Sequence, residues 1–187
     1  GLRFLRDFNL GNRPSPEGKV VIVGGGNTAV DCARVAKRLG YESVAILYRR
    51  TREEMPANAW EVDDSLEEEV DIQYLTFPVR ILGEGGRVSG VECVRMKLGD
   101  PDESGRRKPM RIEGSEFTVR ADTVVTALGQ VPDVGWLPPP LKNKISKKGF
   151  LLADPETGST PVAGIFSGGD VVSGPRTVVE AVAFGKA

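Results

Sequence analysis

The residues best suited to chemistry in this sequence are three consecutive glycines that follow a run of branched apolar residues and precede a helix-forming segment. In the pattern G-x-G-x-x-A, the fixed positions are Gly24, Gly26 and Ala29. Gly24 permits a sharp turn, Gly26 lets the backbone approach a pyrophosphate, and Ala29 lets the helix pack tightly on the strand. Free N–H groups at the helix start, with the positive end of the helix dipole, would hold the phosphates. The stretch therefore predicts a dinucleotide-binding loop.

The segments on either side of the glycines supply the context that this pattern needs. The run from Val20 to Val23 is typical of a strand that is buried on both faces of a parallel sheet. Between Asn27 and Gly40, small residues recur three and four positions apart, which suits a helix packed closely on a sheet. A glycine turn with a purely structural role is the alternative. The order of strand, glycines and helix favours dinucleotide binding.

A second group of candidate residues, Tyr48, Arg49 and Arg50, ends the next expected strand. In an NAD-specific site, an acidic residue about 20 positions beyond the glycines bonds the ribose 2′-hydroxyl. Guanidinium groups stand there instead, and they can hold a 2′-phosphate through forked, charge-assisted hydrogen bonds. This favours NADP(H) over NAD(H). The alternative is that the arginines are solvated or pair with Glu53 and Glu54.

The composition excludes several kinds of chemistry. The chain has 187 residues, a formal net charge of −1, no histidine, and two cysteines, Cys32 and Cys93. A histidine base, a histidine metal ligand and a C-x-x-C redox pair are therefore excluded, and we expect no metal site. We expect both thiols to be buried, and a reducing, cytoplasmic compartment. No apolar run approaches the ~20 residues that span a bilayer, so we expect no membrane partner. The net charge of −1 gives no basic footprint, so we expect no nucleic-acid partner.

The remaining pattern predicts an α/β protein, with a Rossmann-like parallel sheet and an antiparallel meander. The meander is indicated by alternation from Phe77 to Val119, broken by a GEGG turn and by a polar loop, Gly99 to Pro109, whose charged residues 106–108 we expect to be solvated. Trp60 and Leu66 are expected in the core. Helices are expected over residues 2–8, 27–40, 57–69 and 176–187, and other strands over residues 20–23, 43–50, 70–74, 122–127, 150–152 and 164–167.

Several longer motifs resemble a known family. They are GGGNTAVD, YRRTREEMPA, VSGVECVRMKLGDPDESGRR, the ALG of residues 127–129 and the SGGD of residues 167–170, in the order and at the spacing of that family. In these features the chain resembles the small (beta) subunit of NADPH-dependent glutamate synthase and its relatives, which include dihydropyrimidine dehydrogenase and the large subunit of NADH-dependent ferredoxin–NADP oxidoreductase. The resemblance implies a glutathione-reductase-like pair of dinucleotide-binding domains, one for FAD and one for NADPH.

The resemblance also divides the chain and assigns site residues. Residues 1–15 would be a connecting helix and linker, residues 16–130 the NADP(H)-binding domain, and residues 131–187 an incomplete, C-terminal part of an FAD-binding domain. By resemblance, the residues beside the cofactors are Gly25, Gly26, Asn27 and Thr28 at the pyrophosphate, Arg49 and Arg50 at the 2′-phosphate, Ala127, Leu128 and Gly129 at the nicotinamide half, and Gly169, Asp170, Thr177 and Val178 at the flavin.

The activity that the resemblance implies is hydride transfer from NADPH to FAD. Electrons would then pass through iron–sulfur clusters of the region upstream to a large glutamate synthase-type or other electron-accepting subunit. No side chain is expected to act as a nucleophile or general base. The family's FAD pyrophosphate loop and cysteine clusters are not in this chain, so we expect it not to retain FAD.

Three alternatives stay open. The chain could be a nucleotide-binding module without activity of its own, a scaffold that docks a large partner, or a relative of thioredoxin reductase or ferredoxin–NADP reductase. The dithiol of a thioredoxin reductase would precede the glycine strand, where NLGNRPSPEG has no cysteine. That absence disfavours the thioredoxin reductase interpretation.

Overall fold

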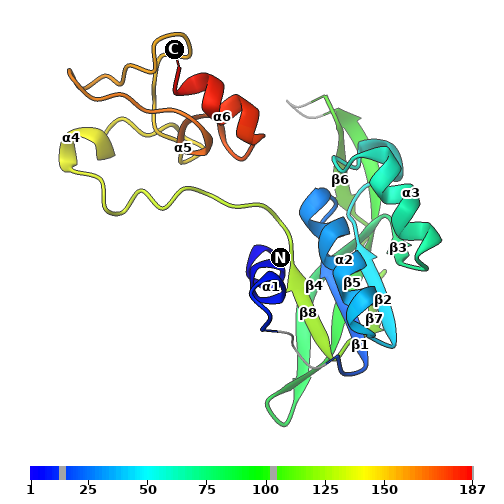
Figure 1. Ribbon diagram of the computed structural model, residues 1–187. Coiled ribbons are helices and arrows are strands. Elements are labelled where there is room, and N and C mark those ends of the chain that lie inside the picture. The colour runs from blue at the N-terminus through cyan, green and yellow to red at the C-terminus, as the bar shows by residue number, and fades with distance from the viewer. Residues whose placement is uncertain (13–15, 102–104, 187) are drawn as a thin grey trace. The chain divides into compact units, whose positions relative to one another are not determined.

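Four parallel strands form the sheet that carries the glycine loop (Figure 1). In spatial order they are β3 (Asp71–Gln73), β2 (Ser43–Leu47), β1 (Lys19–Val23) and β8 (Thr123–Thr126). In the central strand β1, Val20 pairs with Val44 on one side and with Thr123 on the other. The side chains of residues 20–23 are at most 4% exposed, because both faces of the sheet are covered. The predicted doubly buried strand is therefore confirmed. The structure, a computed structural model, describes residues 1–12, 16–101 and 105–186.

Helix α2 (Asn27–Leu39) covers one face of this sheet, and its small residues explain how closely it packs. Ala29, Ala33 and Ala36 are fully buried against the strands. The helix ends at Gly40, whose φ of +92° is the left-handed conformation that glycine adopts without steric cost. Helix α1 (Leu2–Asn9) packs against the same cluster. The predicted helices over residues 2–8 and 27–40 are confirmed.

The segment that follows β2 differs from the prediction. It contains a short 3₁₀ helix, η1 (Arg52–Glu54), and then helix α3 (Ala59–Glu67). Trp60 and Leu66 are 62% and 42% exposed, so the expectation that they enter the core is wrong. The chain between η1 and α3 fills that space instead, because Met55 and Ala57 pack against Tyr48 and the inner face of α3.

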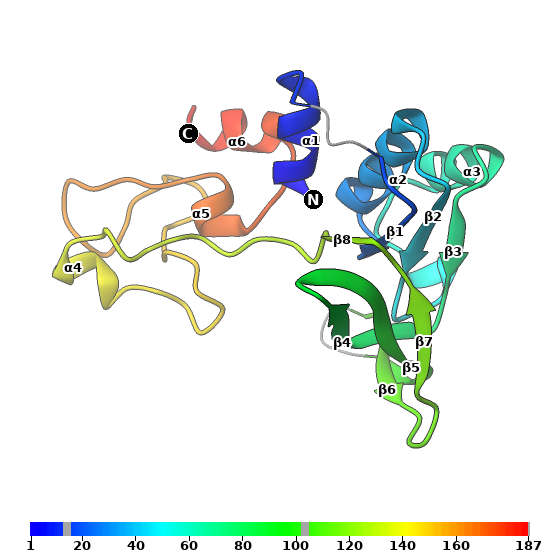
Figure 2. The same cartoon turned by 90° about the horizontal axis from the view of Figure 1, so that it is seen from below.

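An antiparallel sheet covers the other face of the parallel sheet (Figure 2). Its strands are β4 (Thr76–Glu84), β5 (Arg87–Pro101), β6 (Arg107–Arg111) and β7 (Phe117–Arg120). The long strand β5 pairs with β4 and β7 through its first part and with β6 through its second. The prediction of an antiparallel sheet is confirmed. The meander order is wrong, because β7 pairs with β5 rather than with β6, and the polar loop is shorter because β5 and β6 extend into it.

Residues Gly129–Ala187 form a second compact unit, separate from Gly1–Leu128. Its short helices are α4 (Pro139–Lys142), α5 (Asp170–Ser173) and α6 (Val178–Phe184). The strands expected over residues 150–152 and 164–167 reduce to single bridges, Ile145 with Leu151 and Ser159 with Phe166. The core of this unit consists of three buried leucines, at positions 137, 141 and 151, with partly buried apolar residues packed against them. None of the described helices has the length and apolar character to cross a membrane.

Candidate nucleotide-binding site

The glycine loop lies at the carboxyl edge of the parallel sheet. The amide of Gly24 donates to the carbonyl oxygen of Leu47 at 3.2 Å, and the amide of Ala127 donates to that of Val23 at 2.8 Å. The loop therefore lies among the ends of β1, β2 and β8, where open α/β sheets bind ligands. Gly24 has a φ of +149°, and an added Cβ would come within 2.3 Å of the Ala127 carbonyl oxygen. Only glycine fits this turn.

The next two glycines have different surroundings. An added Cβ on Gly25 would meet the ring of Tyr48 at 2.4 Å, whereas one on Gly26 would meet nothing within 4 Å. Tyr48 is held over Gly25 because its hydroxyl donates to the carbonyl oxygen of Glu54 at 2.6 Å. The amide of Ala57 donates to the carbonyl oxygen of Gly25 at 3.1 Å. The loop is thus closed at Gly25 and open at Gly26.

The start of helix α2 supplies the features that an anion requires. Gly26 is its N-cap, with extended backbone and no side-chain hydrogen bond, and the first turn contains no acidic residue. Asn27 is exposed and Thr28 is half-buried. The uncapped N–H groups and the positive end of the helix dipole meet the open surface beside Gly26. These residues therefore fit a pyrophosphate.

The segment from Tyr48 to Glu54, called the arginine loop below, follows β2 at the same edge of the sheet. Arg49 is exposed, whereas Arg50 is only 3% exposed. The Nε of Arg50 donates to the carbonyl oxygen of Arg107 at 2.7 Å. The structure thus brings both arginines to the expected place, but Arg49 alone of the two presents its side chain to solvent.

Arg107 is the residue that sequence reasoning missed. Its side chain is 44% exposed, as expected for a solvated residue, but it also forms ion pairs that were not expected, with Glu53 at 2.9 Å and Glu54 at 2.5 Å. The pairing of β5 with β6 brings Arg107 to the arginine loop from more than fifty positions further along the chain. The sequence shows only that two glutamates follow the arginines; that Glu54 is buried, and so requires a cation beside it, is seen in the structure alone.

Glu54 is ionised in this setting. Its side chain is 7% exposed, and burial alone would raise its pKa. Hydrogen bonds from Thr51 and Arg107 outweigh burial and hold the pKa of Glu54 below its usual value. Thr51 and Glu54 also form a capping box around η1. Burial raises the pKa of Tyr48, partly opposed by Arg50, so this residue stays a neutral phenol.

The residues expected beside the nicotinamide follow β8. Ala127 is half-buried, Leu128 is 69% exposed, and Gly129 has a φ of +94°. Leu128 ends the first compact unit and Gly129 begins the second. The turn at this position therefore leaves the sheet at the edge where the glycine loop lies.

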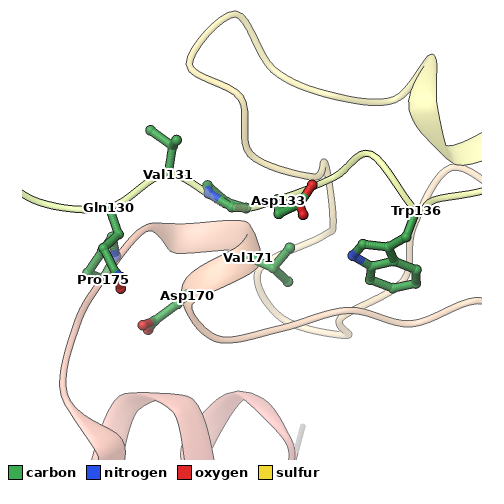
Figure 3. Close-up of a pocket in the computed structure, with 8 residues that line it drawn as sticks. Gln130, Val131, Asp133, Trp136, Asp170, Val171 and Pro175 are labelled. Carbon is green, nitrogen blue, oxygen red and sulfur yellow. The ribbon is translucent and has the colours of Figure 1, made fainter. Parts of the chain in front are cut away.

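The residues expected beside a flavin lie in the second unit. Asp170 borders a cavity of about 290 Å³ that is also lined by Gln130 and Pro175, with Trp136 at the opposite side (Figure 3). Gly169 borders another cavity. The start of α6 is capped by its own residues, since the hydroxyl and amide of Thr177 donate to Glu180. The neighbouring Val178 is 79% exposed. The described residues contain no group of three or more acidic or cysteine side chains placed to hold a metal ion.

Comparison with known proteins decides the family. Residues 1–185 match the family described as pyridine nucleotide-disulphide oxidoreductase. The chain belongs to this family. The chain is homologous to NADPH-dependent oxidoreductases, and the predicted relationship to the glutamate synthase small subunit is confirmed.

Three relatives illustrate the range of this part of the family. The beta subunit of the NADP(+)-dependent formate dehydrogenase of Moorella thermoacetica is 51% identical over 99% of this chain and 26% of its own length. The beta subunit of the Geobacter sulfurreducens NADPH-Fe(3+) oxidoreductase is 46% identical over 97% of this chain and 30% of its own. The small chain of Azospirillum brasilense glutamate synthase [NADPH] is 44% identical over 89% of this chain and 35% of its own length. The chain thus spans about a quarter to a third of these relatives, which are subunits of larger oxidoreductases.

Solved structures agree on the fold. Thioredoxin reductase from T. acidophilum has a TM-score of 0.71 at 23% identity, covering 89% of this chain and 49% of that one. FprA from Mycobacterium tuberculosis in complex with NADPH has a TM-score of 0.68 at 18% identity, covering 92% and 51%. The chain therefore has a thioredoxin-reductase-like fold, and the predicted α/β class is confirmed.

Proposed function

We propose that Gly1–Leu128 binds NADPH at the glycine loop, and that the chain is the NADPH-binding part of an oxidoreductase subunit similar to the glutamate synthase small chain. The observation that carries this proposal is the open surface at Gly26, beside the uncapped start of α2, with the exposed Arg49 at the end of the neighbouring strand. The names of three relatives support the cofactor, since each refers to NADPH or NADP(+).

Each residue has a separate role in this proposal. The amides of Gly26, Asn27 and Thr28 bind the pyrophosphate, while Gly24 and Ala29 give the turn and helix their close approach. Tyr48 supports the loop through the contact of its ring with Gly25. The remaining roles follow the chain: Arg49 binds the 2′-phosphate, Arg50 contributes from its buried position, and Ala127, Leu128 and Gly129 border the nicotinamide half.

The second unit is proposed to belong to an FAD domain, with Gly169, Asp170, Thr177 and Val178 beside the flavin. When bound, the two cofactors supply the hydride chemistry, from NADPH to FAD. The protein's part is then to bind and orient, so no acid or base is required from this chain. Iron–sulfur clusters upstream and an electron-accepting partner subunit complete the proposal, with a cytoplasmic location.

Calorimetry on the 187-residue chain tests the proposal. NADPH is expected to bind, and NADH to bind more weakly. In a Gly26→Ser variant the hydroxyl would cap α2 and fill the phosphate position, so we expect the fold to persist and NADPH binding to be lost. Arg80→Gln, which alters an exposed ion pair of the antiparallel sheet, is the control that retains binding. Unchanged NADPH affinity in Gly26→Ser would contradict the proposed site.

A second candidate function is a nucleotide-binding module without activity of its own. It is favoured by the compactness of Gly1–Leu128, which form a unit of their own that contains the glycine loop and the arginine loop. NADPH binding without reduction of an added dye, even when FAD is supplied, supports the module. Dye reduction after FAD is added supports the oxidoreductase. A thioredoxin reductase activity is disfavoured because Cys32 and Cys93 are both fully buried free thiols.

A further inference from the structure

Arg107 is joined to the arginine loop through both its side chain and its backbone. Its guanidinium contacts Glu53 and Glu54, and lies 3.5 Å from the hydroxyl of Thr51. Its carbonyl oxygen accepts the hydrogen bond from Arg50. One residue of β6 therefore restrains the loop at two places, and the side chain is needed for only one of them.

The two glutamates present an electrostatic problem for a loop that binds a phosphate. A phosphate monoester carries a charge of roughly −1.5 to −2 near neutral pH, and each carboxylate beside it adds repulsion. Glu54 is needed for the structure of the loop, because it is buried and forms the capping box of η1 with Thr51. Glu53 is 82% exposed and contacts Arg107 directly. Arg107 forms ion pairs with both carboxylates and so offsets their charge.

We propose that Arg107 is a positioning residue for cofactor selection: it neutralises Glu53 and Glu54, and so makes the arginine loop prefer NADPH to NADH. The inference rests on the proposed function, because it requires the 2′-phosphate to lie at this loop. The backbone tie to Arg50 does not depend on the side chain. A substitution of Arg107 therefore tests the charge while leaving that tie in place.

The test measures dissociation constants for NADPH and NADH on the full chain by calorimetry. In Arg107→Gln, the preference for NADPH is expected to fall roughly five- to tenfold, with NADH binding almost unchanged, because only the phosphorylated ligand meets the exposed negative charge. Arg107→Lys keeps the charge but loses the forked hydrogen bonds of the guanidinium, so an intermediate loss of the preference for NADPH is expected. Adding Glu53→Gln to Arg107→Gln should recover most of the preference. High salt should shrink all these differences.

Two further variants make the result decisive. Arg80→Gln breaks a comparable ion pair, with Glu92, and leaves the preference unchanged. This pair is remote from the arginine loop, because Glu92 lies nine positions before Pro101, the partner of Arg107 in β5, which is about 30 Å along a strand. Glu53→Gln alone should raise the preference for NADPH, and its exposed side chain makes unfolding a minor concern. It decides the question if Arg107→Gln does not fold, as judged by circular dichroism.

Three outcomes overturn the inference. Equal weakening of both nucleotides in Arg107→Gln would mean that the side chain only supports the loop. An unchanged preference in Arg107→Gln and in Glu53→Gln would mean that the charges do not act on the ligand. If the unmodified chain binds neither nucleotide, the proposed function fails as well, whereas a normal preference in the unmodified chain that no variant alters removes this inference alone.

Discussion

The ring of Tyr48 lies against Gly25, so closely that a Cβ on the glycine would come within 2.4 Å of two ring carbons. This contact joins the end of β2 to the turn that follows β1. Because the Tyr48 hydroxyl is also bonded to Glu54, the glycine turn and the arginine loop are held together by one side chain. Packing at Tyr48 therefore holds the two expected phosphate positions at a fixed spacing.

A comparison of neighbouring glycines follows from this contact. Gly25→Ala is expected to lower the free energy of unfolding by about 1–3 kcal/mol, because the added methyl group overlaps the tyrosine ring. Gly26→Ser is expected to leave stability unchanged or slightly raised, since serine is a good N-cap. Thermal denaturation of both variants measures the difference. Equal destabilisation of the two would show that the loop is not packed as described.

Arg49→Ala should weaken NADPH binding by roughly 1.5–3 kcal/mol for each charged hydrogen bond that is lost, and NADH binding much less. Arg50→Ala should in addition destabilise the fold, because its buried side chain bonds the carbonyl oxygen of Arg107. Calorimetry with both nucleotides, together with a thermal melt, separates these effects. A loss of affinity that is the same for NADPH and NADH in Arg49→Ala would rule out contact with the phosphate.

The two thiols should be unreactive in the folded protein. Burial raises the pKa of Cys32 and the pKa of Cys93 to about 11, so almost no thiolate exists at neutral pH. A thiol reagent at pH 8 is expected to label neither residue until denaturant is added, and both afterwards. Mass spectrometry of the labelled chain counts the modified residues. Rapid labelling without denaturant would contradict the burial of Cys32 and Cys93.

The start of α6 should lose its cap in acid. Hydrogen bonds from the amide and hydroxyl of Thr177, helped by Arg176, lower the pKa of Glu180 to about 2. A lowered folded-state pKa means that the carboxylate stabilises the helix fully above its ordinary pKa near 4.5, and progressively less as the pH falls toward 2. Carboxyl chemical shifts followed by NMR measure the titration. In Glu180→Gln, this acid-dependent change at Thr177 should be absent.

The purified chain is expected to be colourless. The 187 residues contain no second G-x-G-x-x-G pattern that could bind the pyrophosphate of FAD, so FAD should not copurify. Absorption spectroscopy of freshly purified protein checks this directly. A flavin band that persists through dialysis would show that residues 129–187 bind FAD more completely than we propose.

The parallel sheet could be predicted from sequence because its signals are local and strong. The apolar run from Val20 to Val23 indicates a buried strand, and the spacing of small residues in α2 indicates a helix packed closely on a sheet. Trp60 was misplaced because apolar character alone does not reveal that Met55 and Ala57 occupy the space above Tyr48. The fold of the second unit was harder to predict from the sequence, since its isolated bridges have no repeating pattern.

The candidate site divides in the same way. The glycine turn and the paired arginines are each contiguous in sequence, so their residue types and spacing are sufficient to indicate a nucleotide. Arg107 reaches them because β6 pairs with β5. Its partner Glu54 is held in place by the capping box that it forms with Thr51. Such a contact depends on strand register over a long separation, and neither composition nor local periodicity specifies that register.

The place of β8 in the sheet has a consequence for how the protein is made. Thr123 pairs with Val20, which left the ribosome 103 residues earlier, and the whole antiparallel sheet is translated in between. Until then, the backbone amides and carbonyls on one side of β1 have no partner strand, a condition that invites pairing between nascent chains. Shortened products that stop before residue 121 should therefore aggregate, while those that continue past Leu128 should stay dispersed.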